Sequence, residues 1–344
     1  MKKKLLAVLL GTAIVITAVA GCGNQNTETP ASQEESAEVP EEAAVEMAEE
    51  AEPAEEAENE GGKVIGFCPP TMNNPFFYFI EQNVREAVEA KGDTLITMDP
   101  QLDSQKQIEQ VEDLLLQDID ALLLCPFDST AIKPALVAAD EAGVPVIVFD
   151  TKVVDDEYAA TTVASDNINA GRVVGEDLAG KLEKGSKIAV IYSPAGETDR
   201  YRLQGFEEGI EGMDYEIVAK LDGKGDTGVS MPLAEDILQA NADLGAFFCC
   251  NDQAAIGAVQ AIESAGRTGE VLVYGVDGSP EGKAAIAEGT MTGTGAQSPA
   301  NIGLKAVDAA YSILAGESVE KDTVVETFLI NADNVEEYGT DGWQ

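Results

Sequence analysis

Short apolar runs alternate with amphipathic segments along most of this chain. Eight runs rich in β-branched and aromatic residues are predicted to be strands, at residues 64–68, 94–98, 121–125, 144–149, 187–192, 216–221, 246–250 and 271–276. The segments between them have the helical period, as where Ile108, Val111 and Leu115 fall on one face. Nearly continuous apolar strands that alternate with helices predict parallel sheets covered by helices on both sides.

The alternating pattern begins twice along the chain. Residues 63–67 and 187–191 each start a series of strands and helices, so we predict two doubly wound α/β lobes of similar build. Residues 161–167, which read TTVASDN, lie between the two series and are not rich in Gly, Ser or Pro as a flexible linker is. We therefore predict that this segment crosses from one lobe to the other as a strand.

The first 62 residues have a different composition. Residues 1–22 carry three lysines, an apolar run and then small residues before Cys22, which predicts a secretory signal. The ending VAGC resembles a bacterial lipobox, which implies cleavage before Cys22 and a lipid on its sulfur; an ordinary signal peptide with an incidental cysteine is the alternative. Residues 23–62 contain 14 Glu and no Lys or Arg, so we predict a disordered, self-repelling tether.

The net charge limits the partners of the remaining chain. Of the formal charge of −42, residues 1–22 contribute +3 and residues 23–62 contribute −14, which leaves −31 for residues 63–344 (18 basic and 49 acidic side chains). A surface this acidic repels nucleic acids and anionic membranes, so a function that depends on a basic patch is excluded. An anionic ligand would need local cations.

Histidine is absent from the sequence, and this excludes triads and metal sites that depend on it. Beyond Cys22 the thiols are Cys68, Cys125, Cys249 and Cys250, none of them in a CxxC pair. Neighbours on a strand point to opposite faces, so Cys249 and Cys250 cannot hold one ion together. We expect four small apolar strand residues, no metal and no cofactor, and leave a Cys68–Cys125 disulfide open.

Polar and aromatic residues follow several predicted strands, where ligands bind to open parallel sheets. The first strand is followed by PPTMNNPFF and the fifth by SPAGETDRYR, and Asp150, Asn251 and Asp277 each follow another directly. Asp accepts hydrogen bonds, Arg donates in a fork and Asn does both, as the hydroxyls of a sugar or polyol require. Phe76 and Phe77 would be the flat wall against which the ring lies.

Some of these residues also have a structural interpretation. An Asn after a strand is often only a helix cap, and we expect Asp128 and Asp252 to be caps. Phe79 and Ile80 are expected in the core. The joint pattern, rather than any one residue, favours a binding site.

Several blocks carry a family resemblance: TMNNPFF (71–77), FDT (149–151), ASDN (164–167), RYRLQGF (200–206), CNDQAAIGA (250–258), GVDGSPEG (275–282) and GAQSPANIG (295–303). In this order and spacing they resemble the periplasmic sugar-binding proteins of the ribose-binding type, which capture substrates for ABC importers. The resemblance covers residues 63–330, approximately. It implies two lobes joined by three crossing strands, near residues 164–166, 297 and 326–328.

The resemblance also implies lobe boundaries and site residues. The N-terminal lobe would be residues 63–164 plus 298–326, and the C-terminal lobe 165–297 plus 327–344. The ligand-binding residues that it implies are Asn74, Phe76, Phe77, Asp150, Thr151, Arg202, Asn251, Asp277 and Gln297, with Arg200 as a second choice to Arg202.

Two positions depart from the ribose-binding pattern. Thr151 stands where that pattern has Arg, and Gly225 stands near the place of an aromatic residue. The site thus loses a fork donor and a stacking face, which favours a different pentose, a hexose or a polyol such as inositol over ribose. A D-x-D-x-D-G calcium loop does not occur in the sequence.

The sequence as a whole predicts a monomeric, lipid-anchored, extracytoplasmic binding protein. It would capture a neutral monosaccharide or polyol by closure of its lobes and then dock on the permease subunits of an ABC importer. A receptor that presents its closed form to a sensor kinase or chemoreceptor is the alternative. The signal sequence argues against a sugar-responsive repressor. A glycosidase using Asp150 and Asp277 is a further alternative, but both aspartates fit binding fully, so we predict no enzyme.

Overall fold

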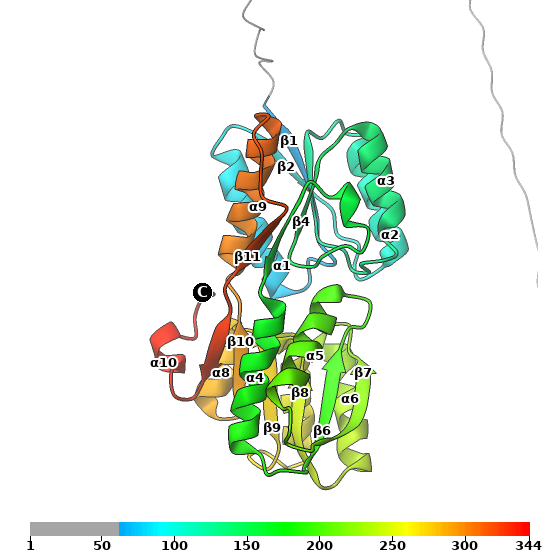
Figure 1. Ribbon diagram of the computed structural model, residues 1–344. Coiled ribbons are helices and arrows are strands. Elements are labelled where there is room, and N and C mark those ends of the chain that lie inside the picture. The colour runs from blue at the N-terminus through cyan, green and yellow to red at the C-terminus, as the bar shows by residue number, and fades with distance from the viewer. Residues whose placement is uncertain (1–61) are drawn as a thin grey trace, which may run out of the picture. The chain divides into compact units, whose positions relative to one another are not determined.

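Residues 62–344 are described by the computed structural model, and they form two α/β lobes, each built on a six-stranded sheet (Figure 1). The predicted signal sequence, the lipidated Cys22 and nearly all of the predicted tether lie outside the described residues.

The first lobe contains a fully parallel sheet in the order β11-β5-β4-β3-β1-β2. Helices α1 and α9 pack on one face of this sheet and α2 and α3 on the other. The alternation in β1 explains this arrangement, because Phe67 points toward α1 and α9 whereas Cys68 points toward α2 and α3. The elements are β1 (Val64–Cys68), α1 (Pro75–Glu89), β2 (Thr94–Thr97), α2 (Ser104–Leu115), β3 (Ala121–Leu124), α3 (Lys133–Ala142), β4 (Val146–Phe149), the short 3₁₀ helix η1 (Asp156–Tyr158), β5 (Thr161–Ser165), α9 (Pro299–Leu314) and β11 (Asp322–Val325).

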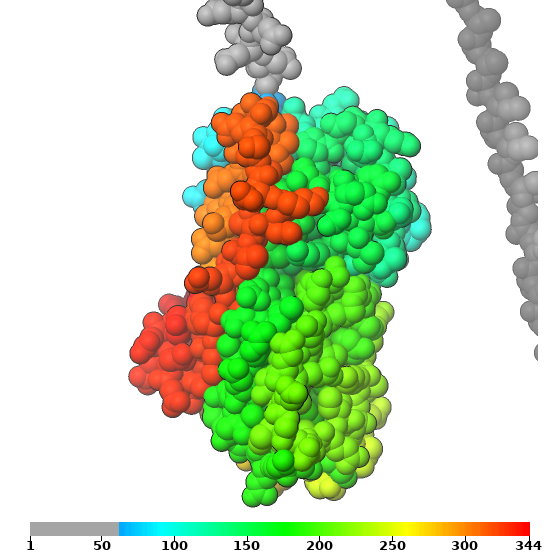
Figure 2. Space-filling model, in the orientation of Figure 1, coloured from blue at the N-terminus to red at the C-terminus, as the bar shows by residue number. Residues whose placement is uncertain are grey.

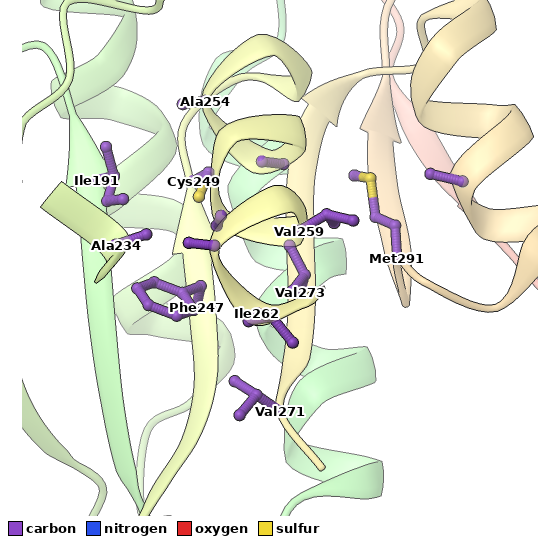
Figure 3. Packing of buried hydrophobic residues seen from close by; sticks show 14 of the residues in the cluster. Ile191, Ala234, Phe247, Cys249, Ala254, Val259, Ile262, Val271, Val273 and Met291 are labelled. Carbon is purple, nitrogen blue, oxygen red and sulfur yellow. The ribbon is translucent and has the colours of Figure 1, made fainter. Parts of the chain in front are cut away.

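The second lobe repeats the plan, with the strand order β12-β10-β9-β8-β6-β7. Helices α4 and α5 cover one face, and α6, α7 and α8 cover the other, where Phe247, Val273 and Ile262 lie in the core (Figure 3). The elements are α4 (Asn167–Lys181), β6 (Lys187–Tyr192), α5 (Glu197–Gly209), β7 (Glu216–Asp222), α6 (Thr227–Ala240), β8 (Leu244–Cys249), α7 (Asp252–Ser264), β9 (Leu272–Asp277), α8 (Pro280–Glu288), β10 (Gly293–Ala296), β12 (Phe328–Asn331) and α10 (Val335–Tyr338).

The predicted α/β fold is confirmed, with one correction to the sheets. All eight predicted strands are present, and their ends differ from the prediction by at most two residues. Strand β12, however, pairs antiparallel with β10, whereas we predicted parallel sheets. The reason is that β12 follows β11 after only two residues and enters the second sheet from the end at which the parallel strands leave it.

The chain passes between the lobes three times, as predicted. The passages lead from β5 to α4, from β10 to α9, and from β11 to β12, at residues 165–167, 296–299 and 325–328. In the space-filling view, the orange and red part of the chain runs along one side of the molecule past the junction of the lobes (Figure 2).

The four cysteines of the described part are buried and unbonded. Cys68 and Cys125 face opposite sides of the first sheet, so the disulfide that the sequence left open is not formed. Burial raises the pKa of the Cys68 thiol to about 12, as for an inert core residue. Within residues 62–344, the helices are all too short or too polar to cross a membrane.

Candidate functional site

A cavity of about 150 Å³ lies between the two lobes, at the carboxyl ends of the strands. Its walls are the segments that follow β1 to β4 in the first lobe and β6 to β9 in the second. Eight of the ten ligand-binding residues predicted from the sequence line it: Asn74, Phe76, Phe77, Asp150, Thr151, Arg202, Asn251 and Asp277.

The first turn of α1 forms the aromatic wall. Asn74 is the N-cap of this helix, and its Oδ1 accepts a hydrogen bond from the N–H of Phe76 at 2.9 Å, with Pro75 as the first helical residue. The cap leaves the amide Nδ2 of Asn74 free to donate. The rings of Phe76 and Phe77 meet edge to face, with centroids 5.4 Å apart. The first turn therefore supplies both a helix cap and a flat apolar surface.

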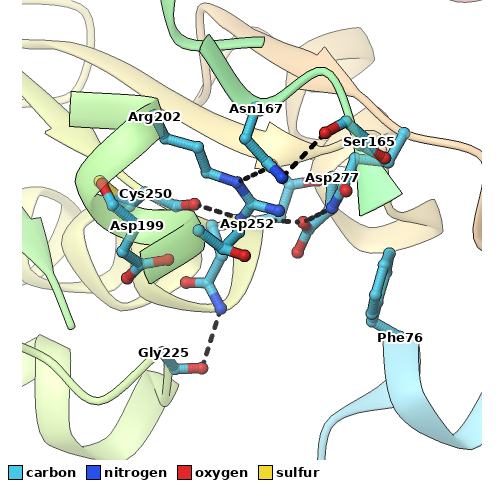
Figure 4. Close-up of polar contacts among 12 residues, drawn as sticks. Phe76, Ser165, Asn167, Asp199, Arg202, Gly225, Cys250, Asp252 and Asp277 are labelled. Atoms are coloured by element: carbon cyan, nitrogen blue, oxygen red, sulfur yellow. Dashed lines mark hydrogen bonds and ion pairs between the residues drawn. The ribbon is translucent and has the colours of Figure 1, made fainter. Parts of the chain in front are cut away.

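Arg202 lies at the centre of a buried polar network in the second lobe (Figure 4). Its Nε donates to Oδ1 of Asn167 at 2.9 Å, and its Nη1 donates to the carbonyl of Cys250 at 2.6 Å. The same Nη1 lies 3.4 Å from Oδ1 of Asp277. These contacts from three different elements fix the plane of the guanidinium, so that it meets a ligand preorganised.

Asp150 and Asp277 occupy strained backbone positions. Their φ angles are 61° and 142°, in a region that side chains other than Gly rarely adopt. Strain of this kind is held where the surrounding structure enforces it, commonly at functional sites. Oδ2 of Asp150 accepts a hydrogen bond from the hydroxyl of Thr151 at 3.1 Å. Its Oδ1 is buried and has no partner within residues 62–344.

Asn251 has a structural role besides lining the cavity, and the expected role of Asp252 needs a correction. Asn251 is the N-cap of α7, accepting from the N–H of Ala254, and its Nδ2 donates to the carbonyl of Gly225 at 3.0 Å. Asp252, which we expected to be a cap, instead accepts hydrogen bonds from Ser279 and Thr294 in the interior of the lobe. Its position within the first turn of α7 points it at the loop after β9.

Two predicted ligand-binding residues do not line the cavity. Gln297 is fully buried behind Asp277, and its Nε2 donates to Oδ1 of that residue at 2.7 Å. It therefore orients a carboxylate of the site. Arg200 is exposed on α5, where its Nη1 donates to the carbonyl of Pro194 at 2.6 Å. Positions two residues apart on a helix face in different directions, which separates Arg200 from Arg202.

The cavity includes residues that the sequence analysis missed. The missed polar side chains are Thr71, Asn73, Gln101, Ser193, Thr198, Asp199, Lys224, Asp226 and Gln253, and Phe127 adds a third aromatic ring. Each of them follows a strand, so the same search at strand ends could have found them. Asp199 lies in a stretch that was singled out after the fifth predicted strand, but only its arginines were chosen.

The rims of the two lobes are in contact beside the cavity. The N–H of Glu197 donates to Oγ of Ser129 at 3.0 Å. The hydroxyl of Thr198 lies 2.9 Å from that of Thr151 and 3.1 Å from the carbonyl of Asp150. Residues of α5 in the second lobe thus bond directly to the loops after β3 and β4 in the first.

Burial dominates the electrostatics of the cavity. It raises the pKa of Asp150, and it raises that of Asp199 to about 6, while the nearby Arg202 partly opposes both shifts. Burial also raises the pKa of Asp277 well above its usual value, again against the attraction of Arg202. Three carboxyls that share one guanidinium leave the site short of positive charge.

Known proteins with this fold and these motifs include sugar-binding components of transporters. Residues 65–318 match the family described as the periplasmic binding protein domain. The ribose import binding protein RbsB of Bacillus subtilis is 37% identical over 267 residues, which cover 76% of this chain and 86% of that protein. RbsB of Escherichia coli is 32% identical, with 77% of this chain and 90% of that protein covered.

Solved structures agree with the sequence matches. An ABC transporter solute binding protein from Bacillus halodurans with bound myo-inositol has a TM-score of 0.76 and 29% identity, covering 81% of this chain and 98% of that chain. Another from Actinobacillus succinogenes with bound D-allose has a TM-score of 0.73 and 28% identity, covering 80% and 100%.

These relatives are substrate-binding proteins of transporters, so the glycosidase alternative is set aside and the chain is a binding protein rather than an enzyme. By its family match and by its identity to RbsB, this chain belongs to the periplasmic binding protein family, and within it to the ribose-binding type.

Proposed function

We propose that the protein captures a monosaccharide or polyol in the cavity between its lobes for an ABC importer. One observation carries the proposal: a single cavity combines aromatic rings from α1 with hydrogen-bonding groups from both lobes. The ring of the ligand would lie against Phe76 and Phe77, with its hydroxyls bonded to Asn74, Asp150 and the Arg202–Asp277 pair. The inositol and allose bound by its structural relatives support this ligand class.

Closure of the lobes is the proposed mechanism. In an open form each lobe would present half of the polar groups to water. A ligand that bonds to both halves binds the closed form more tightly and so shifts the equilibrium toward it. The contacts of Thr198 with Thr151 and Asp150 support a closed state that is stabilised by the rims as well as by the ligand. The lobes move as the units 63–164 plus 298–326 and 165–297 plus 327–344 in this proposal.

The closed protein would then deliver its ligand to the importer. The closed form would dock, as a monomer, on the permease subunits of an importer. The periplasmic binding protein family works outside the cytoplasm, and the lipobox-like ending at Cys22 supports a lipid anchor, with residues 23–62 as tether. Release of a Cys22→Ser variant into the medium would support the anchor, and unchanged retention at the membrane would contradict it.

Two neighbouring arginines provide the test of ligand capture. Calorimetry with a panel of pentoses, hexoses and polyols should find a ligand for the wild-type protein. Arg202→Met should weaken its binding by about 1–3 kcal/mol or more, because the ligand and Asp277 lose a charged donor. Arg200→Met removes an equal charge two residues away, outside the cavity, and should bind as the wild type does.

The outcome can contradict the proposal in two ways. One is the absence of heat with every member of the panel. The other is equal binding by the two variants, which would place the ligand away from Arg202. Thermal unfolding of both variants shows whether a loss of binding reflects a loss of folded protein.

A further inference from the structure

The residues that line the cavity carry more negative than positive charge. Asp150, Asp199, Asp226 and Asp277 oppose only Arg202 and Lys224, which gives a formal charge of −2 with every group ionised (four acidic and two basic side chains). Asp226 and Lys224 lie in the loop at the start of α6, where Asp226 caps the helix and Lys224 is exposed. The rest of the cavity lining therefore holds three carboxyls and one guanidinium.

Two of the three guanidinium nitrogens of Arg202, Nε and Nη1, already have partners within the protein. They bond to Asn167 and to the carbonyl of Cys250, and Nη1 forms an ion pair with Asp277. This pair accounts for one positive and one negative charge. The carboxylates of Asp150 and Asp199 take no part in this ion pair.

Neither of these two carboxyls has a cationic partner in the part of the chain that the structure describes. Oδ2 of Asp199 accepts the N–H of Ser193 at 2.6 Å. Oδ2 of Asp150 accepts the hydroxyl of Thr151 and, at 3.8 Å, the thiol of Cys125, both neutral, while its buried Oδ1 receives nothing. The side chain of Asp150 is only 4% exposed and lines the cavity. An unpaired carboxylate at such a position costs free energy that a bound cation would recover.

The two carboxyls belong to the same part of the cavity, although they come from different lobes. Thr151 and Thr198, which follow Asp150 and precede Asp199 in the sequence, touch through their hydroxyls at 2.9 Å. The charge of Asp150 also contributes to the raised pKa of Asp199. A group bound between them would be attracted by both lobes at once.

We propose that the ligand is an amino sugar or amino polyol whose ammonium group lies between Asp150 and Asp199. This inference rests on the proposed function and narrows its ligand class. An ammonium supplies three N–H donors and a positive charge, which suits Oδ1 of Asp150 and the carboxylate of Asp199. The hydroxyls remain for Arg202, Asp277 and Asn74, and the ring lies on Phe76 as before.

The same charges argue against two other ligand classes. A sugar acid or sugar phosphate would bring a further negative charge to carboxyls that already lack a partner. A neutral sugar could donate hydroxyl hydrogens to them, but it would leave their charge uncompensated in a buried site, or would require Asp199 to be protonated. The neutral ligand is therefore the outcome to test against.

Matched pairs of compounds separate these possibilities. Calorimetry on the whole protein at neutral pH and low salt would compare D-glucosamine with D-glucose, D-galactosamine with D-galactose, and an amino-deoxy-inositol with myo-inositol. The N-acetyl form of each amine controls for size without charge. In at least one pair we expect the amine to bind about tenfold more tightly than both neutral forms. Asp199→Asn should abolish this preference, because it keeps an acceptor for Ser193 but removes the charge.

A control variant and three outcomes complete the test. Asp140→Asn on the exposed side of α3 changes the net charge equally and should keep the preference. If the neutral members bind as tightly as their amines, the inference is overturned while the proposed function stands. A preference that survives in Asp199→Asn overturns the assigned position of the ammonium. Binding by no member of any pair overturns this inference, whereas the proposed function is contradicted only if the wider panel of pentoses, hexoses and polyols gives no heat either.

Discussion

Asp199 couples the protonation of the cavity to the stability of the protein. Burial raises its pKa from 3.8 to about 6, against the attraction of Arg202 and with the repulsion of Asp150 and Asp222. The folded state therefore holds this proton more tightly than the unfolded chain does. The resulting stability is fully present below the unfolded pKa and is lost as the pH rises through about 6.

The expected result is a ligand-free protein that unfolds at a higher temperature at pH 5 than at pH 7. Asp199 should contribute about 1 kcal/mol of this difference, because pH 5 lies only one unit below its folded pKa of about 6 and the full effect of the shift appears only below the unfolded pKa. Thermal unfolding across this pH range, for the wild type and Asp199→Asn, provides the measurement. The variant should show a flatter dependence, since asparagine does not titrate. Identical slopes in the two proteins would contradict the assignment.

At this scale the sequence predicted the type of most site residues but not how each is used. Asn74, Arg202 and Asp277 lie in segments that follow predicted strands and were implied by the family resemblance, and they do line the cavity. The position of a side chain relative to a neighbouring loop is not encoded in that pattern. Gln297, which the family resemblance implied as a ligand contact, lies behind Asp277, and Asp199 was passed over.

Helices α4 and α5 approach each other so closely that their backbones are in contact. A Cβ on Gly171 of α4 would lie 1.9 Å from the carbonyl oxygen of Arg202, and a Cβ on Gly205 of α5 would lie 1.9 Å from that of Ile168. Only glycine permits this approach. It brings Asn167 of α4 within hydrogen-bonding distance of Arg202 on α5, so the packing of two helices sets the geometry of the site.

Gly171→Ala should separate these two helices. We expect a loss of about 1–3 kcal/mol of unfolding free energy, because the contact is with backbone that cannot turn aside. Ligand binding should weaken as well, since Arg202 moves away from Asn167. Chemical denaturation and calorimetry measure the two effects.

Gly180→Ala, in the same helix, provides the matched control. Apart from its chain neighbours and the backbone of its own helix, no atom of residues 62–344 lies within 4 Å of the position that its Cβ would take, so alanine should be neutral or stabilise the helix by up to about 1 kcal/mol. Equal stabilities of the two variants would show that the helices are not in backbone contact.

The elements themselves were largely predictable, and the exception is instructive. Strands such as β1 and β6 have their ends at the predicted residues because buried parallel strands are marked by uninterrupted apolar runs. The direction of β12 depends on which side of the second sheet the chain enters, and a run of four residues contains no signal for that. The local sequence pattern thus predicts where a strand lies, whereas the direction in which it pairs depends on the path of the chain through the whole lobe.

The restart of the pattern at residue 187 predicted two lobes. It did not predict that residues 339–344 would contact both of them. Lys283 of α8, in the second lobe, donates from Nζ to the carbonyl of Gly342 at 2.7 Å. Trp343 packs against α1 of the first lobe, with its ring 5.6 Å from that of Phe76 and 6.0 Å from that of Phe79. Nothing in the local sequence predicts a contact between residues so far apart in the chain.

This bridging position makes Trp343 a natural reporter of closure. It is the one tryptophan in the sequence, its neighbour Gly342 is held by the second lobe, and its ring touches the back of a predicted ligand contact in the first. A movement of one lobe relative to the other must therefore change the surroundings of the ring.

We expect ligand to shift the intensity or wavelength of tryptophan emission, with a midpoint equal to the calorimetric Kd. Trp343→Phe should bind ligand but show no such change, because phenylalanine keeps the aromatic contact with Phe76 and Phe79 without the indole emission. A wild-type protein whose emission stays constant while calorimetry records binding would mean that the lobes do not move relative to this segment, and the closure mechanism would have to be abandoned.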